Sequence, residues 1–259
     1  MQHLKLGILQ FDQVWEDKQA NFERIKALLA GCQQLDLLLL PEMFHTGFSM
    51  QIALADDWQN STGLQFLKTI AQAYDTAIYT SLMVQDHAAF YNRGVFIEPN
   101  GTVYTYDKRK AFGLGGEDEY FKNGSSEQIV TYKNWRFNLQ ICYDLRFPEL
   151  IRNRIDQDGT VAYDVLLNVA NWPQKRISHW DALLKARAIE NQCYFLASAQ
   201  GGLHQNQRRT WGQSMLVDPW GNIVSELATG EGCVLGELDS TALEEVRSKL
   251  PALKHRKLI

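Results

Sequence analysis

The sequence predicts a mixed-sheet α/β sandwich, formed by residues 1–259 as a single domain. Two observations indicate this fold class. Segments with the apolar spacing of helices alternate with short apolar segments typical of strands, as in α/β proteins. Several neighbouring strands are nevertheless joined by tight turns, and such hairpins are antiparallel, which excludes a purely parallel sheet. The chain of 259 residues contains no internal repeat, low-complexity stretch or linker that would divide it.

The N-terminal segment predicts a β-α-β unit. Residues 4–10 are apolar and alternate as a strand does, and apolar residues recur at helical spacing over 22–32. A continuous apolar run over 35–40 ends at Pro41, as expected of a strand buried on both faces. Glu42 therefore lies just past the C-terminal end of this strand, where open α/β sheets tend to bind ligands.

Hairpins dominate the middle of the chain. Residues 94–97 and 102–106 flank the turn Pro99-Asn100-Gly101, in which the proline presets φ and the glycine accepts a positive φ. Residues 128–132 and 135–141 flank a second turn in the same way. The remaining predicted elements are strands over 164–169 and 193–199, a hairpin of 215–218 with 223–227, and helices starting near Ser178 and spanning 240–250.

Cys142 stands where the predicted strand over 135–141 ends and polar residues begin. Residues 149–155 then have helical spacing, so the cysteine occupies a strand-to-helix turn. The dipole at a helix N-terminus favours the thiolate, which is the reactive form of cysteine. The alternative interpretation is that Cys142 is simply buried and apolar, as most free cysteines are.

Three blocks, in order along the chain, resemble the nitrilase superfamily of carbon-nitrogen hydrolases, and its amidase branch in particular. They are L-L-L-L-P-E-M-F at 37–44, Y-D-K-R-K-A-F at 106–112 and I-C-Y-D-L-R-F-P-E at 141–149. Supporting matches lie at 168–173, 185–191 and 212–221, so the resemblance covers nearly the whole chain. It implies a nitrilase-type α-β-β-α sandwich with mixed sheets.

The resemblance also implies catalytic roles. Cys142 is the expected nucleophile, Glu42 the general base, and Lys108 the cation that stabilises the tetrahedral intermediate, with the backbone N–H of Tyr143 as a second oxyanion donor. A free thiol has a pKa of about 8.5 and therefore needs such a base or cation. On position alone, Glu42 is equally well explained as a surface carboxylate, and Lys108 is better explained as a solvated charge.

Members of the family often carry a second glutamate shortly after the lysine. Glu117 matches it best by its distance from Lys122-Asn123-Gly124, and Glu119 is the alternative because Glu117-Asp118-Glu119 leaves the register ambiguous. Lys110 stands where many relatives have histidine, which leaves the local pocket open. The resemblance implies neither a metal nor an organic cofactor.

The sequence says less about the substrate pocket than about the catalytic residues. Phe44 and Trp172 follow strand ends and are predicted to form apolar walls, with ordinary core packing as the alternative. Arg176 is a candidate to pair with a substrate carboxylate, with a surface role as the alternative. Within the family, the ω-amidases are the most similar; they hydrolyse the terminal amide of α-keto acid amides such as α-ketoglutaramate. A deaminated glutathione amidase, a carbamoylase, a true nitrilase and a non-catalytic binding protein are the alternatives.

Composition excludes several other classes. The net charge of −4, with no basic block, opposes binding to nucleic acid or anionic membranes. No apolar run approaches the ~20 residues of a membrane span, and the N-terminus does not resemble a signal peptide. Four scattered cysteines are typical of reduced thiols in a cytoplasmic protein. The six histidines form no metal-binding motif, which opposes a metal-dependent hydrolase.

A small-molecule amide is the expected partner, and the resemblance implies a homodimer.

Overall fold

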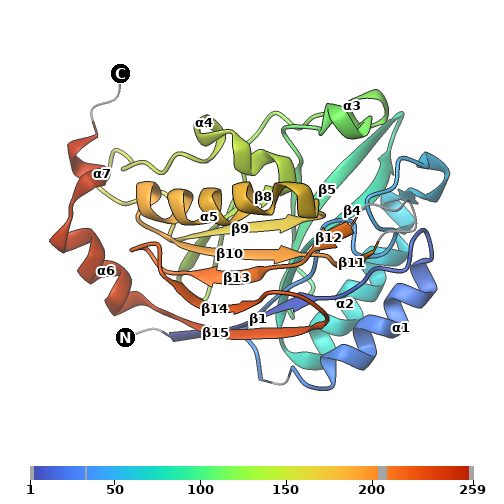
Figure 1. The fold of residues 1–259 in the computed structure, drawn as a ribbon, viewed down its shortest axis with the longest axis horizontal. Coiled ribbons are helices and arrows are strands. Elements are labelled where there is room, and N and C mark those ends of the chain that lie inside the picture. Colours follow the sequence, from blue (N-terminus) through green and yellow to red (C-terminus); the bar gives the residue numbers. More distant parts are fainter. Residues whose placement is uncertain (1–2, 33, 204–208, 257–259) are drawn as a thin grey trace.

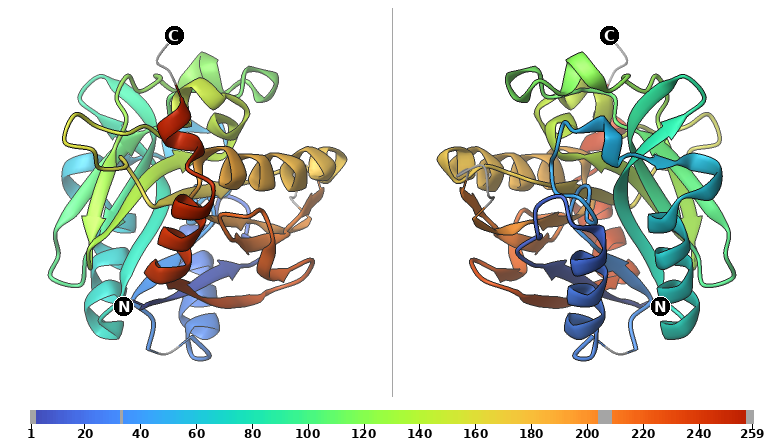
Figure 2. Two further views of the ribbon diagram at one scale, coloured as in Figure 1. Left: turned by 90° about the vertical axis from the view of Figure 1, so that its left-hand side faces the viewer. Right: turned by 90° about the vertical axis from the view of Figure 1, so that its right-hand side faces the viewer.

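The computed structural model describes residues 3–32, 34–203 and 209–256. Within these ranges the chain forms an α-β-β-α sandwich (Figure 1), in which two mixed sheets pack face to face. Helices cover the outer faces of both sheets, as the two side views in Figure 2 show. The predicted mixed-sheet sandwich is therefore confirmed.

The first sheet is parallel at its centre and antiparallel at its edges. Its strand order is β15 (Gly232–Asp239), β1 (His3–Gln10), β2 (Leu37–Leu39), β4 (Ala77–Asp86), β5 (Ala89–Ile97) and β6 (Val103–Asp107), with β3 (Asp56–Asp57) beside β4. Strands β1, β2 and β4 are parallel, whereas the hairpin strands β5 and β6 and the edge strand β15 run antiparallel to their neighbours.

The second sheet repeats this plan. Its order is β14 (Ile223–Leu227), β13 (Ser214–Val217), β10 (Tyr194–Ala199), β9 (Val165–Ala170), β8 (Trp135–Ile141) and β7 (Ile129–Tyr132). Strands β8, β9 and β10 are parallel, and the flanking pairs are antiparallel. A separate short hairpin consists of β11 (Gly201–Leu203) and β12 (Arg209–Trp211).

Helices complete the outer layers. The first sheet is covered by α1 (Lys18–Leu29) and α2 (Thr62–Tyr74), and the second by α5 (Ile177–Asn191). Two short helices, α3 (Glu117–Tyr120) and α4 (Pro148–Ile151), lie in loops near the strand ends, and α6 (Ser240–Lys249) and α7 (Ala252–His255) follow at the C-terminal side. No helix in the described ranges is long and apolar enough to cross a membrane.

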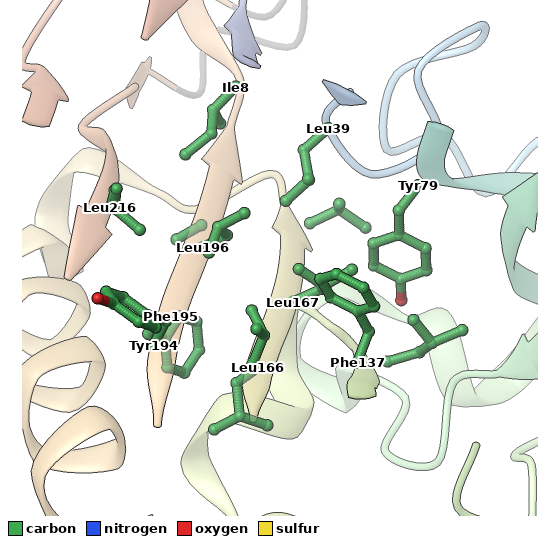
Figure 3. Close-up of a cluster of buried hydrophobic side chains, with 14 of the residues drawn as sticks. Ile8, Leu39, Tyr79, Phe137, Leu166, Leu167, Tyr194, Phe195, Leu196 and Leu216 are labelled. Atoms are coloured by element: carbon green, nitrogen blue, oxygen red, sulfur yellow. The ribbon is translucent and has the colours of Figure 1, made fainter. Parts of the chain in front are cut away.

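The main core fills the space between the sheets. Leu39 and Tyr79 from the first sheet face Phe137, Leu167 and Leu196 from the second (Figure 3), and all five side chains are fully buried. Full burial of one such aliphatic or aromatic side chain stabilises the fold by about 1.5–3 kcal/mol. This layer fixes the relative position of the two sheets, and so of the loops at their ends.

Two predicted helices extend several residues past their observed ends. The helix expected over 149–155 ends at Ile151, because the Asn153 side chain instead bonds to the backbone of Tyr163 and its N–H donates to Asn191. The helical spacing over 22–32 extends past the observed end of α1 at Leu29. Helix α2 and strands β4 and β15 were not assigned from the sequence.

Candidate active site

Three of the predicted catalytic residues lie within three residues of the end of a strand. Glu42 follows β2, Lys108 follows β6, and Cys142 follows β8. The Lys108 Nζ donates a hydrogen bond of 2.8 Å to Glu42 Oε1, and both side chains are almost completely inaccessible to water. Both carboxylate and ammonium act electrostatically on the Cys142 thiol, so the three groups share one site at the strand ends.

Glu117 is the fourth member of this cluster. Lys108 Nζ donates to Glu117 Oε1 at 2.9 Å and to Oε2 at 2.8 Å, and Glu117 is fully buried at the start of α3. Its Oε2 also accepts a 2.6 Å hydrogen bond from the backbone N–H of Phe112. Glu119 is exposed. The structure therefore places Glu117, and not Glu119, against the lysine.

Lys108 remains charged despite its burial. Desolvation would lower the pKa of its ammonium group, but the carboxylates of Glu117 and Glu42 raise that pKa above its ordinary value. One ammonium group faces two carboxylates, so the cluster carries one excess negative charge when all three are ionised. Because a buried charge without a partner is strongly destabilising, each member depends on the others.

Cys142 adopts an unusual backbone conformation. Its φ is +44°, in the left-handed region, and it begins the 3-10 helix Cys142–Arg146. Non-glycine residues with positive φ are uncommon and are enriched at functional sites. Cys142 is also one of the residues that line a cavity.

The prediction that a helix N-terminus favours the Cys142 thiolate is wrong. Burial and the nearby Glu42 carboxylate raise the pKa of the thiol well above its ordinary value, and Lys108 only partly opposes them. The physical reason is that the following helix has just five residues and a correspondingly small dipole, whereas desolvation acts on the whole thiolate charge. The resting cysteine is therefore a thiol and needs a base.

Two asparagines hold the Glu42 carboxylate in place. The Asn171 backbone N–H donates to Glu42 Oε2 at 2.9 Å, and its Nδ2 donates to the Glu42 carbonyl oxygen at 2.7 Å. Asn92 Nδ2 donates to Glu42 Oε1 at 2.8 Å. Neither role was predicted. Asn171 follows β9, so the strand-end rule that selected Glu42 also applies to it, whereas Asn92 lies within β5 and carries no such signal.

Asp144 ties the nucleophile turn to the lysine segment. Its carboxylate accepts hydrogen bonds from the Tyr106 hydroxyl at 2.8 Å, the Lys110 N–H at 2.9 Å and the Ile141 N–H at 3.1 Å. Burial raises the pKa of Asp144 to about 6, although Lys108 opposes the shift. Lys110 thus contributes its backbone here, while its ammonium group lies 5.2 Å from the ring centroid of Phe147.

A cavity with aromatic walls opens onto the thiol. It is lined by Phe48, Phe112, Cys142, Tyr143, Arg146, Asn171, Trp172, Pro173, Arg176 and Thr210. Tyr143, Trp172 and Arg176, three of the residues singled out in the sequence, thus lie at the cavity. Phe44 does not: it is fully buried in the apolar cluster beneath α1, where its ring lies 6.0 Å from that of Phe22. The prediction of Phe44 as a pocket wall is wrong, because the chain turns at Met43, whose φ is +45°, and directs the next side chain into the core.

Two guanidinium groups share this cavity. Arg146 lies over the Trp172 ring, with Cζ 4.9 Å from its centroid, and Arg176 lies 5.1 Å from the centroid of Phe112. Within the described ranges, neither arginine forms an ion pair with a carboxylate. Burial and the charge of Arg176 lower the pKa of Arg146, as expected of two adjacent cations. Arg146 was not predicted, although it lies in the nucleophile block.

Comparisons with known proteins agree with this arrangement. Residues 5–248 match the family model for carbon-nitrogen hydrolases. The omega-amidase YafV of Yersinia enterocolitica is 37% identical over 253 residues, covering 97% of this chain and 96% of that protein. The 2-oxoglutaramate amidase of Bacillus subtilis (strain 168) is 32% identical, with 95% of each chain covered. The crystal structure of XC1258 from Xanthomonas campestris, a CN-hydrolase superfamily protein with an arsenic adduct in the active site, has a TM-score of 0.97 and 35% identity, covering 100% of this chain and 99% of that one.

The chain therefore belongs to the carbon-nitrogen hydrolase family, within the nitrilase superfamily. This confirms the resemblance predicted from the three sequence blocks, and with it the nitrilase-type sandwich. More specifically, the chain is an amidase of that superfamily, similar to proteins named for ω-amidase and 2-oxoglutaramate amidase activity.

Proposed function

We propose that this protein is an ω-amidase: it hydrolyses the terminal amide of a small carboxylate-bearing substrate, such as the α-keto acid amide α-ketoglutaramate, to the acid and ammonia. The observation that carries the proposal is the pair of guanidinium groups in the cavity of the Cys142 thiol, Arg146 and Arg176, neither of which has a carboxylate partner within the described residues. Arg146 Nη1 contacts the ring of His179, with 3.2 Å to Nδ1. Guanidinium groups without carboxylate partners are suited to binding a substrate carboxylate bidentately. The names of the relatives at 37% and 32% identity support the same substrate class.

In the proposed first half-reaction, Glu42 accepts the thiol proton and the Cys142 sulfur attacks the amide carbonyl carbon. The resulting oxyanion is stabilised by Lys108 and by the backbone N–H of Tyr143. Tyr143 lies in the first turn of a 3-10 helix, whose N–H groups have no intrahelical acceptor, which supports this assignment. One such donor typically contributes ~10²–10³ in rate. Glu42 then returns the proton to the amide nitrogen, the C–N bond breaks, and ammonia leaves a thioester.

In the second half-reaction, water attacks the thioester carbonyl while Glu42 accepts one of its protons. The same oxyanion donors act again, the C–S bond breaks, and the proton returns to the sulfur. Glu42 is held for both steps, because Asn171 donates to one of its carboxylate oxygens and Lys108 and Asn92 donate to the other. Lys108 and Glu117 do not exchange protons in this scheme; the lysine remains a cation.

Ammonia release tests the proposal. We expect turnover of α-ketoglutaramate and α-ketosuccinamate in preference to glutamine, deaminated glutathione and a simple nitrile, and none by Cys142→Ala, whose fold is checked by circular dichroism. Substantial ammonia release by Cys142→Ala would contradict the mechanism. Preference for glutamine or the nitrile would contradict the substrate assignment, and preference for deaminated glutathione would favour that alternative amidase. The homodimer and the cytoplasmic location expected from the sequence remain predictions.

A further inference from the structure

Asn92 joins the two carboxylates of the site through one amide nitrogen. Its Nδ2 donates to Glu42 Oε1 at 2.8 Å and to Glu117 Oε1 at 2.9 Å. The side chain is buried in β5, and the backbone carbonyl oxygen of Asn92 accepts a hydrogen bond of 3.0 Å from the Lys108 backbone N–H across the hairpin. Asn92 therefore contacts every charged member of the cluster, through its side chain or its backbone.

The orientation of this amide is determined by its partners. An oxygen in the position of Nδ2 would face two carboxylate oxygens and be repelled by both, so the nitrogen must occupy it. The other end of the amide, Oδ1, is buried and has no hydrogen-bond partner within the described part of the chain. An unpaired buried acceptor is unfavourable for folding. The side chain is thus suited to what its nitrogen does, and not to stabilising the core.

The charge balance of the cluster indicates what the Asn92 Nδ2 contributes. Glu42 and Glu117 share a single cation, Lys108, so their mutual repulsion is only partly offset. A further cation at the position of Asn92 would neutralise the excess charge and weaken Glu42 as a base. A neutral amide with two N–H donors holds both carboxylates at a fixed separation and leaves the excess negative charge in place.

We propose that Asn92 is a positioning residue that bridges Glu42 and Glu117, and so keeps the Glu42 carboxylate aligned to accept the proton of Cys142. This inference rests on the proposed role of Cys142 and Glu42. It predicts that loss of the bridge slows proton transfer from the thiol and leaves substrate binding intact, because Asn92 does not line the cavity.

Two substitutions test the bridge. Asn92→Leu removes both donors together with the unpaired oxygen, and Asn92→Asp places a third carboxylate between the other two. We expect kcat to fall at least ~50-fold in both, with KM within about threefold of the wild type. We also expect the acidic limb of the pH profile of kcat/KM to move to higher pH, because a carboxylate that loses a donor binds protons more readily.

The matched control is Asn138→Asp. Asn138 is also buried and its Nδ2 donates to a glutamate, Glu127, at 2.9 Å, but it lies away from the cluster in β8. A general penalty for a buried asparagine-to-aspartate change would lower the melting temperature of both aspartate variants. Only Asn92→Asp should move the pH profile.

Alkylation of Cys142 by iodoacetamide, followed by peptide mass spectrometry across pH, separates this inference from the proposed function. If the wild type hydrolyses no amide, the proposed function fails, and slower alkylation with a shifted pH profile in the Asn92 variants would still support the bridge. If Asn92→Leu keeps the wild-type alkylation profile and, where turnover is measurable, kcat within threefold, the bridge is refuted. A fall in activity that matches only the loss of folded protein would refute it as well.

Discussion

The two ends of the active site differ in how their charges are satisfied. At the inner end, Glu42, Glu117 and Lys108 are buried and hydrogen-bonded to one another. At the outer end, Arg146 and Arg176 line the cavity without a carboxylate partner within the described ranges. Groups that perform chemistry need fixed positions before the substrate arrives, whereas groups that recognise an anion must be left available for it. The charged groups of the inner end are therefore paired with one another, whereas the arginines of the outer end are available for the negative charge of a substrate.

A substitution in the buried charge cluster at the inner end should have the largest effect on activity and stability. Lys108→Met leaves Glu42 and Glu117 without their cation, so we expect a loss of activity of at least ~10³-fold together with a loss of about 3–5 kcal/mol in the free energy of unfolding. Ammonia release and urea denaturation measure the two. Adding Glu117→Gln to Lys108→Met should recover stability but not activity. Full activity of the single variant would show that the cluster is only structural.

Substitution of the arginines at the outer end should change substrate binding more than the rate of the chemical step. For Arg146→Gln and Arg176→Gln we expect KM for α-ketoglutaramate to rise about 10–100-fold, because a charge-assisted hydrogen bond to the substrate carboxylate contributes roughly 1.5–3 kcal/mol. Hydrolysis of a neutral amide such as butyramide serves as the control and should change little. Equal losses for the charged and the neutral amide would exclude carboxylate recognition by these arginines.

His45 extends the comparison, because its imidazole ring is buried and titratable but has no hydrogen-bond partner in the described part of the chain. Both ring nitrogens are unpaired within the described residues, and the Asp56 carboxylate is 4.0 Å away. Burial lowers the pKa of His45 from 6.5 to about 3, although Asp56 opposes the shift, whereas Lys108 keeps its charge through its partners. In the folded protein the His45 ring stays neutral down to about pH 3, whereas in the unfolded chain it takes up a proton below pH 6.5. Stability is therefore complete above pH 6.5 and decreases as pH falls toward 3.

The corresponding substitution is His45→Leu. It should remove about 2 kcal/mol of the acid destabilisation at pH 5 relative to pH 7.5, as measured by urea denaturation at both pH values. His87→Gln is the matched control, because the His87 side chain is 94% exposed and should contribute little. An identical acid dependence in wild type and His45→Leu would mean that His45 does not titrate in the way its burial indicates.

Local patterns explain what could be predicted from the sequence. The strands that precede Glu42 and Cys142 are apolar runs with clear ends, so the position of both residues just past a strand was predictable from the sequence. Position does not determine direction, however. Phe44 stands beyond the same strand as Glu42, but the positive φ of Met43 turns it into the core. Asn92 lies in the middle of β5, where only tertiary contacts reveal its role.

The Glu117 and Glu119 alternative shows the same limit. The two residues are neighbours in an acidic segment, and their order along the chain does not say which faces inward. The short helix α3 decides, because it buries Glu117 and exposes Glu119. Likewise, Asn153 ended a helix that spacing alone extended to 155, since its side chain competes for backbone hydrogen bonds.

The protonated state of the resting thiol bears on the durability of the protein. Oxidants such as peroxides attack the thiolate, and the damage can proceed to sulfinic and sulfonic acids that are not restored. Because burial and Glu42 raise the pKa of Cys142, the sulfur is in its less oxidisable form whenever it is not engaged in turnover. The arrangement that makes a base necessary for catalysis also protects the nucleophile between catalytic cycles.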